Sequence, residues 1–433
     1  MLFTKAGDKP ARTAHINVCY GGSALARPPV VSVRSISSAF GSHLCVRAQI
    51  PRKNAQIRHL QRRATDTSIF LHSAMTELEA LRPYLADVDL QSPTALVKYL
   101  GICGAVLGLW GVNSLSEDKV MRFLSKNARE KAYFEFEIPK KSGGARRISA
   151  PDIRLKHIQQ SINILLQSLC EVSPEATGFV PGRSIVTNAK IHLGSKVIFN
   201  CDLQDFFPSI SKEMVRGSLI NELRKYNASH RVVDILANLV TVPDKNGTEV
   251  LPQGAPTSPV VSNIVVKRLD QRLRVFAEKN GYRYSRYADD ITFSSVADTH
   301  PALPIRSNAI ISIIKDCGFD INPKKTVLST AGKRHEVTGL TVGCKVNVSR
   351  SYVKQLRVLM HLWESRGYAE ARIIYMRDFR GGQEVELAKV INGKINYLCM
   401  VKGKNDSTYR RFKFRYRNLM KQLKASTPAS TSE

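Results

Sequence analysis

The chain has 433 residues, of which 43% are hydrophobic, enough for a sizeable core divided over two or three domains. Its formal net charge of +29 favours nucleic acid or another anionic partner, although a solvated basic exterior is the plainer alternative. The eight cysteines form no CxxC pair and have no histidine cluster beside them, which argues against a zinc site or a disulfide framework and favours a reducing cytosol.

The N-terminal region is basic and has little pattern. Met1–Thr65 contains one acidic residue, Asp8, so we expect residues 1–66 to be a basic extension without a fixed fold. A transit peptide shares this composition, as do a disordered arm, an RNA-binding tail and a mis-assigned start. Residues 67–132 are expected to be helical, most clearly in Ser116–Ala132. The run at 100–112 is too short and too rich in glycine to cross a membrane, so we expect no membrane partner.

A β-hairpin is predicted next. Tyr133–Ile138 alternates like a strand, residues 140–144 favour a turn, and Ala145–Ser149 forms the returning strand. The basic side chains of this hairpin, Lys140 and Arg146 among them, could close on a triphosphate. On this stretch alone, an ordinary basic turn is the better explanation.

A carboxylate follows a buried strand. After a predicted core helix, Leu155–Leu169, the run Val197–Phe199 has the pattern of a buried strand, and Asp202 stands at its end. Burying a carboxylate beside apolar neighbours is costly unless it meets a cation. For a single Asp after a strand, a capping or turn role is the commoner explanation.

The segment LPQGAPTSP at 251–259 precedes a predicted helix. Ser258 can cap that helix with Pro259 in its first position, and Gly281 can end it. Gln253 and Gly254 would then lie before a helix N-terminus, where backbone N–H groups favour phosphate. A plain loop rich in proline and glycine competes with this interpretation.

Two adjacent carboxylates lie in a predicted tight hairpin, Tyr282–Ser294. Its tip is Ala288-Asp289-Asp290, where neighbouring charges repel unless water screens them or a divalent cation binds them. Combined with Asp202, they supply oxygen ligands for two hard cations, which would activate an attacking hydroxyl and stabilise leaving pyrophosphate. Asp202, Asp289 and Asp290 are therefore the candidate catalytic and metal-binding residues, with two Mg²⁺ ions as cofactors.

The order of these motifs resembles the fingers and palm of reverse transcriptases over residues 133–345. The strings are the cationic hairpin, DLQDFFPSI, PQGAPTSP, YADD and GFDINPKKT. NAKIH at 188–192 and VTG at 337–339 further resemble the NAxxH and VTG patterns of bacterial retron enzymes, rather than group II intron or retroviral ones. The resemblance implies an α+β fold of the right-hand polymerase class, with fingers, a ferredoxin-like palm and a helical thumb.

The resemblance also implies roles for individual residues. Phe207 matches the position under the incoming sugar, where a ring would favour deoxynucleotides. The implied nucleotide-binding residues are Lys140, Arg146, Phe207, Gln253, Gly254 and Lys324, with Lys325 as the alternative lysine for protonating pyrophosphate. The implied RNA- or primer-binding residues are Asn188, His192, Val337, Thr338 and Gly339. His192 taken alone is better explained as a structural histidine, and Ala145 stands where a basic residue is frequent.

Residues 346–425 are expected to be a helical thumb with an RNA-recognition region, followed by a tail at 426–433. Tyr409–Tyr416 interleaves aromatic and basic side chains, including Arg410, Arg411 and Arg415. Basic groups can neutralise phosphates while rings stack on bases. An amphipathic helix that buries its aromatic residues is an equally good explanation.

The resemblance implies an RNA-directed DNA polymerase of the bacterial cytoplasm that binds dNTPs and a cognate non-coding RNA. It would prime from an RNA 2′-hydroxyl, leave a branched RNA–DNA product, and act in anti-phage defence with a separate effector protein. A group II intron-like or other defence-associated reverse transcriptase is the nearer alternative. A non-catalytic RNA-binding protein is remoter, because such a protein has no use for three converging carboxylates near RNA phosphates.

Overall fold

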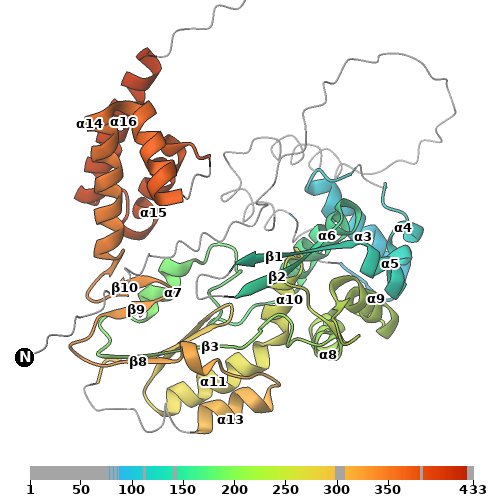
Figure 1. The fold of residues 1–433 in the computed structure, drawn as a ribbon. Helices are drawn as coiled ribbons and strands as arrows, with labels where there is room; N and C mark the ends of the chain where they lie inside the picture. The colour runs from blue at the N-terminus through green and yellow to red at the C-terminus, as the bar shows by residue number, and fades with distance from the viewer. Residues whose placement is uncertain are drawn as a thin grey trace, which may run out of the picture. The chain divides into compact units, whose positions relative to one another are not determined.

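The structure is a computed structural model of the whole chain. It describes residues 87–110, 114–139, 144–297, 308–380 and 384–426, together with Leu78, Leu81 and Leu85 (Figure 1). The expected N-terminal extension, Lys140 and residues 427–433 lie outside the described residues. Within these ranges, the helices are too short or too polar to cross a lipid bilayer.

The chain divides into two compact units, each assembled from separate stretches of sequence. Among the described residues, the first unit contains residues 173–204 and 268–426, and the second contains those up to 172 and residues 205–267. We call them the sheet unit and the hairpin unit. The domain boundaries expected from the sequence follow chain order instead, and they stay a prediction.

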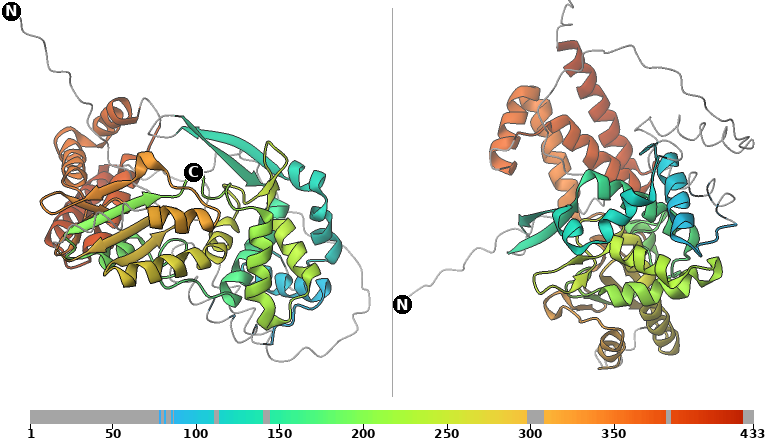
Figure 2. Two further views of the ribbon diagram at one scale, coloured as in Figure 1. Left: turned by 90° about the horizontal axis from the view of Figure 1, so that it is seen from below. Right: turned by 90° about the vertical axis from the view of Figure 1, so that its right-hand side faces the viewer.

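A four-stranded antiparallel sheet lies at the centre of the sheet unit, in the order β6-β7-β3-β8. Its strands are β3 (Val197–Asp202), β6 (Arg283–Tyr287), β7 (Asp290–Ser295) and β8 (Val327–Ser329). Helices α11 (Lys267–Lys279) and α13 (Asn308–Asp316) lie along one face, as Figures 1 and 2 show. The resulting βαββαβ connectivity is ferredoxin-like, which confirms the expected palm. Between β3 and α11 the chain passes through the hairpin unit.

A second, smaller sheet completes this part of the unit. Strands β9 (His335–Val337), β10 (Leu340–Val342) and β11 (Val346–Asn347) are antiparallel, and helix α7 (Ile185–Ile191) packs beside β10. The α7 helix begins at a capping box between Ser184 and Thr187, which satisfies backbone N–H groups at its start.

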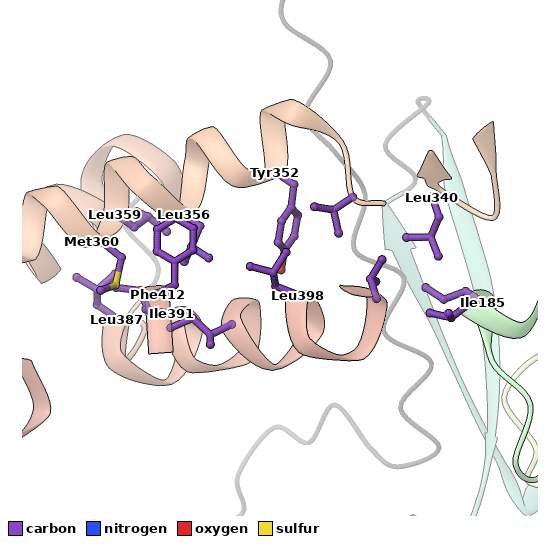
Figure 3. Close-up of a cluster of buried hydrophobic side chains, with 14 of the residues drawn as sticks. Ile185, Leu340, Tyr352, Leu356, Leu359, Met360, Leu387, Ile391, Leu398 and Phe412 are labelled. Atoms are coloured by element: carbon purple, nitrogen blue, oxygen red, sulfur yellow. The ribbon is translucent and has the colours of Figure 1, made fainter. Parts of the chain in front are cut away.

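Three helices form the C-terminal part of the sheet unit: α14 (Arg350–Arg380), α15 (Leu387–Lys402) and α16 (Ser407–Ser426). Their shared core continues to Ile185 and Leu340 (Figure 3). Burying one large aliphatic side chain contributes about 1.5–3 kcal/mol, so this cluster holds the helices to the small sheet. Gly367, with a φ of 73°, bends α14 where a side chain would be strained.

The hairpin unit contains the expected β-hairpin, formed by β1 (Tyr133–Pro139) and β2 (Ala145–Pro151). A short second hairpin joins β4 (Val242–Pro243) to β5 (Glu249–Val250). Within the described residues, the α-helices of the unit are α3 (Pro93–Val106), α4 (Glu117–Met121), α5 (Lys126–Lys131), α6 (Ile153–Leu169), α8 (Lys212–Leu223), α9 (His230–Val240) and α10 (Ser258–Val265). The buried guanidinium of Arg129 pairs with Glu249 and so ties α5 to β5.

Two helical predictions were wrong in detail. The helix expected to run from Ser258 to Gly281 is broken at Val266, and its N-cap is Thr257. The Ser258 hydroxyl instead donates to the carbonyl of Pro252, 2.5 Å away, which holds the preceding loop. The helix expected over Ser116–Ala132 is divided into α4, a 3₁₀ turn at Arg122–Leu124, and α5. In both places apolar spacing carries on through the break, so periodicity alone does not reveal it.

Candidate catalytic site

The three candidate carboxylates come from two neighbouring strands. Asp202 ends β3 directly opposite Asp290, the first residue of β7. The backbone N–H of Leu203 donates to the carbonyl of Asp289, at 2.9 Å, and fixes the tip of the hairpin beside the end of β3. Ala288 holds a left-handed φ of 57°, which turns the chain tightly before Asp289. The sheet register therefore brings Asp202, Asp289 and Asp290 to one edge.

The side-chain ammonium of a lysine contacts the carboxylate of Asp202. The Nζ of Lys325 lies 2.8 Å and 2.9 Å from the two Asp202 carboxylate oxygens. The Lys325 turn is docked on the same strand end, because the N–H of Asn322 donates to the Asp202 carbonyl at 2.8 Å. Both lysines considered from the sequence are exposed, but the structure distinguishes them, because it is the Lys325 side chain that contacts Asp202.

The electrostatics of this edge favour a cation. Burial, followed by the negative charges of Asp289 and Asp202, raises the pKa of Asp290 to about 7, and Lys325 opposes the shift. A carboxyl pKa raised by neighbouring carboxylates signals a concentration of negative charge that bound cations would relieve. Concentrated negative charge attracts a divalent cation, and in this structure Lys325 neutralises part of it.

These residues fit Mg²⁺ by donor type and charge. Carboxylate oxygens are the ligands this ion prefers, and the Lys325 ammonium shows that Asp202 accepts a cation in this position. Within the described ranges, the carboxylates are not already drawn together as a set of three ready metal ligands. Asp202, Asp289 and Asp290 are the residues that would hold the ion.

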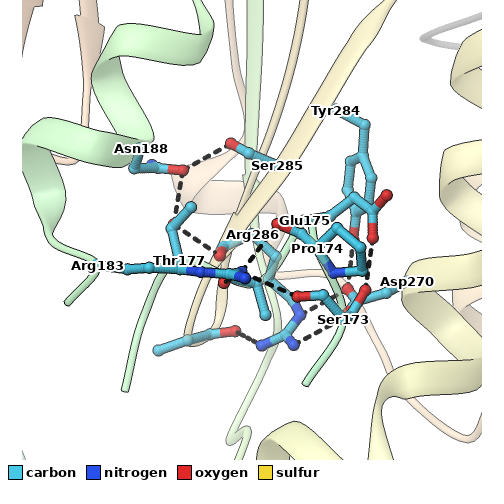
Figure 4. A network of polar contacts seen from close by, with 12 residues as sticks. Ser173, Pro174, Glu175, Thr177, Arg183, Asn188, Asp270, Tyr284, Ser285 and Arg286 are labelled. Carbon is cyan, nitrogen blue, oxygen red and sulfur yellow. Dashed lines mark hydrogen bonds and ion pairs between the residues drawn. The ribbon is translucent and has the colours of Figure 1, made fainter. Parts of the chain in front are cut away.

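The NAxxH residues form a buried network behind the site. The side chains of Asn188 and His192 are fully buried. His192 Nε2 lies 2.7 Å from the Ser285 hydroxyl on β6, and Nδ1 lies 2.7 Å from the Ser294 hydroxyl on β7. Ser285 in turn donates to Asn188 Oδ1 at 2.6 Å, a contact drawn in Figure 4. The structure therefore does not present these two side chains to RNA, and the direct contact expected from the sequence is corrected to a bracing role across the hairpin.

Comparison with known proteins identifies the family. The sequence profile of the family described as "Reverse transcriptase (RNA-dependent DNA polymerase)" matches residues 138–355. The chain is 40% identical to the retron Mx65 reverse transcriptase of Myxococcus xanthus over 246 residues, covering 54% of this chain and 56% of that protein. It is 31% identical to the retron Ec83 reverse transcriptase of Escherichia coli over 257 residues, covering 58% and 81%. The chain belongs to the retron reverse transcriptases.

The matches cover part of each chain. This retron reverse transcriptase spans a little over half the length of the Mx65 enzyme that it matches. Among solved structures, telomerase from Candida albicans is similar at 12% identity with a TM-score of 0.39, over 68% of this chain and 64% of that one. The family assignment therefore depends on the sequence matches.

The expected primer-end residues are the last residue of β9, Val337, and the two residues of the turn to β10, Thr338 and Gly339. Val337 is fully buried in the core of the sheet unit, so its side chain packs and does not face a ligand. Thr338 has a left-handed φ of 46°, and its hydroxyl donates to the carbonyl of Ile185 at 3.3 Å. Of the three residues, Gly339 is the exposed one, so a primer contact would be made by the backbone of this turn.

The remaining nucleotide-binding candidates belong to the hairpin unit. The carbonyl of Gln253 accepts a hydrogen bond from the N–H of Ser149 on β2, at 2.9 Å. Gly254 has a φ of 131°, and a Cβ there would meet the Ser149 carbonyl oxygen at 2.8 Å, so only glycine fits. Arg146 is exposed near the tip of the same hairpin, and Phe207 is half-buried against Phe206.

The basic and aromatic stretch of α16 is divided between core and surface. Phe412 is fully buried, whereas Phe414 is 66% exposed. Arg415 is paired with Glu364, with its Nε 2.8 Å from Oε1, which leaves it less available to RNA than expected. Arg410 and Arg411 are exposed. The buried face of the helix therefore fits the packing explanation, and RNA contact stays a prediction for the exposed face.

Sequence reasoning missed one buried pair beside the turn that carries Ala288 and Asp289, namely Arg286 and Asp270. Both side chains are fully buried and bonded to each other. A signal was present, because Asp270 stands among the apolar residues Leu269, Leu273 and Ala277 that α11 turns inward. An acidic residue on the apolar face of a helix indicates a buried cationic partner.

Proposed function

We propose that this retron reverse transcriptase is an RNA-directed DNA polymerase that copies part of a cognate structured non-coding RNA. The observation that carries the proposal is the register of β3 and β7, which sets Asp202 opposite Asp290 with Asp289 at the adjoining turn. Two carboxylate-bearing strands at one sheet edge suit the transfer of a nucleotidyl group.

The residues would divide the reaction as follows. Asp202, Asp289 and Asp290 would hold two Mg²⁺ ions, which, when bound, activate the attacking hydroxyl and stabilise the pyrophosphate leaving group. Lys325 would leave Asp202 as metal binds and become free to donate a proton to pyrophosphate. Phe207, Gln253 and Gly254 would shape the dNTP pocket, and Arg146 and Lys140 would hold the triphosphate.

RNA binding is assigned to the exposed face of α16. Arg410, Phe414, Arg417, Lys421 and Lys424 are all exposed and recur every three or four residues, so they share one face. Cations there can neutralise RNA phosphates, and Phe414 can stack on an unpaired base. We call these five residues the α16 stripe.

The retron-specific steps are part of the same proposal. The enzyme would prime from a 2′-hydroxyl of its RNA, leave a branched RNA–DNA molecule, and serve anti-phage defence in the bacterial cytoplasm with a separate effector protein. Support comes from the similarity to retron enzymes.

The test is a reaction of purified protein with the RNA encoded beside its gene, Mg²⁺ and dNTPs. We expect DNA joined to RNA by a 2′,5′ linkage, detected by resistance of the branch to ribonuclease and its loss on debranching. Ordinary cDNA without a branch would overturn the retron-type reaction and favour a group II intron-like enzyme. RNA binding with no dNTP incorporation would favour a non-catalytic RNA-binding protein.

A variant pair tests the assignment of the carboxylates. Asp202→Asn should abolish synthesis while leaving RNA affinity unchanged, because it removes a metal ligand and adds no bulk. Asp316→Asn is the matched control, since Asp316 is 53% exposed and its side chain, among the described residues, pairs with Arg272 alone. Equal activity in the two variants would contradict the metal assignment.

A further inference from the structure

The turn that carries Ala288 and Asp289 is held by a hydrogen bond from the buried guanidinium of Arg286. Arg286 lies on β6, two residues before Ala288. Its Nε and Nη2 donate to the two oxygens of Asp270 at 2.7 Å and 2.8 Å, forming a two-pronged ion pair (Figure 4). Its remaining nitrogen, Nη1, donates to the carbonyl of Ala288 at 2.9 Å. The Tyr284 hydroxyl also donates to Asp270, at 2.8 Å.

The hydrogen bond from Arg286 is made to the peptide group that directly precedes Asp289. The Ala288 carbonyl belongs to the peptide group joining Ala288 to Asp289, so its direction sets where the Asp289 side chain leaves the turn. Ala288 has a left-handed φ of 57°, a conformation that costs a residue with a Cβ about 1 kcal/mol or more. A charged donor on that carbonyl holds the peptide in place, which an apolar side chain could not do.

The outer side of the turn is held as well. The N–H and hydroxyl of Thr177 both donate to the Arg286 carbonyl, at 2.7 Å and 2.9 Å. Gly178 follows so closely that a Cβ there would stand 2.6 Å from the backbone nitrogen of Ala288. Arg183 fixes this outer segment by donating to the carbonyls of Ser173 and Pro174, at 3.0 Å and 2.9 Å. The turn is therefore confined between Arg286 inside and the Thr177–Gly178 backbone outside.

Stability alone does not explain a fully buried ion pair. Removing two charges from water costs several kcal/mol, and well-packed apolar side chains of similar size are often equally stabilising. What an apolar pair cannot supply is a directed hydrogen bond to the Ala288 carbonyl. We therefore attribute the buried pair to the positioning of the Ala288 carbonyl and not to added stability.

We propose that Arg286, oriented by Asp270, is a positioning residue that fixes the Ala288–Asp289 peptide and so aims the Asp289 carboxylate. The inference rests on the proposed polymerase function, in which Asp289 is a metal ligand. Arg286 itself does not touch substrate; it acts through the backbone of the turn.

The decisive variant replaces the ion pair by apolar residues, Arg286→Met with Asp270→Leu. We expect this double variant to fold but to lack the hydrogen bond to the Ala288 carbonyl. Its kcat should fall by about 100-fold, the scale of a misplaced catalytic group, while the KM for dNTP changes little. The Mg²⁺ concentration needed for half-maximal activity should rise. A folded double variant with the kcat and Mg²⁺ dependence of the parent enzyme would overturn the proposal.

Gly178→Ala provides a second approach that keeps the ion pair intact. Its methyl group would press on the Ala288 nitrogen from outside, so the same loss of kcat with unchanged KM is expected. Gly217→Ala on α8 is the control, because nothing lies within 4 Å of a Cβ placed there. Equal kcat in the two alanine variants would contradict confinement of the turn, even if the double variant failed to fold.

A readout independent of polymerisation separates this inference from the proposed function. Binding of Mn²⁺, followed by electron paramagnetic resonance, should weaken in Gly178→Ala and in the double variant but not in Gly217→Ala. If the parent protein binds Mn²⁺ yet incorporates no dNTP, the proposed function fails while the positioning role is still tested. Unchanged Mn²⁺ binding in folded variants would refute the positioning role.

Discussion

The Nζ of Lys325 lies within 2.9 Å of both carboxylate oxygens of Asp202. In the proposed function, Asp202 holds Mg²⁺ through these same oxygens, so the metal would have to compete with the Lys325 ammonium for them. The 3₁₀ turn that carries Lys325 is docked on the Asp202 carbonyl through Asn322. This docking would keep the lysine near Asp202 even after it released the carboxylate, as its proposed role as proton donor to pyrophosphate requires.

We predict opposite effects of Lys325→Met on metal binding and on turnover. Without the ammonium, Asp202 should bind Mn²⁺ or Mg²⁺ several-fold more tightly, whereas kcat should fall because the proton donor is absent. Titration calorimetry and single-nucleotide incorporation measure the two effects. Lys324→Met is the control, because Lys324 is exposed and its side chain does not reach Asp202 in the structure. Identical behaviour of the two variants would contradict the competition.

Much of this edge could be predicted from local sequence. The strand before Asp202 and the hairpin around Asp289 follow from apolar runs and turn propensity, both of which act within a few residues. The partner of Asp202 could not, because Lys324 and Lys325 differ only in the direction that a 3₁₀ turn gives them. The position of Asp270 on the apolar face of α11 indicates a buried cation, but the identity of that cation as Arg286 depends on how α11 packs against β6, which no local pattern encodes.

The NAxxH motif illustrates the same limit. Its resemblance to retron enzymes suggested contact with RNA, but the register of β6 and β7 places Ser285 and Ser294 on either side of His192. Ser195 donates to Ser294, and Ser285 donates to Asn188. This order leaves Ser294 to donate to Nδ1 and Ser285 to accept from Nε2, so the network suits a neutral imidazole.

Acid should therefore weaken the fold through His192. Burial, followed by the nearby charge of Arg283, lowers the pKa of His192 to about 3. The unfolded chain takes up a proton below pH 6.5 while the folded chain does not, so stability falls as the pH drops from 6.5 towards 3. At pH 5 the loss from this group is about 2 kcal/mol at most. Urea denaturation at pH 7.5 and pH 5 measures it.

His192→Gln should reduce that pH dependence, since glutamine can hydrogen-bond but cannot take up the proton. His361→Gln on α14 is the matched control, because His361 is exposed. If both variants lose the same stability between pH 7.5 and pH 5 as the parent protein, His192 is not the group responsible.

Gly254→Ala should disturb the proposed nucleotide-binding segment through the backbone. The added methyl group meets the Ser149 carbonyl oxygen at 2.8 Å, and a φ of 131° disfavours any side chain. We expect a loss of about 1–3 kcal/mol in unfolding free energy and a raised KM for dNTP. Gly247→Ala, at a φ of 78° with only the end of Lys126 nearby, separates backbone strain from the clash. A KM that rises equally in both would count against a special role for the Gln253–Gly254 segment.

The α16 stripe predicts how RNA affinity depends on salt. Arg417→Ala with Lys421→Ala removes two exposed cations from that face, and each RNA phosphate that is no longer neutralised should reduce the slope of log K against log salt concentration by about 0.7–0.9. Filter binding of the cognate RNA at several salt concentrations gives the slope. Arg377→Ala is the control, since Arg377 is exposed on α14 and already pairs with Asp378. A slope unchanged by the double substitution, or reduced as much by Arg377→Ala, would place the RNA elsewhere on the protein.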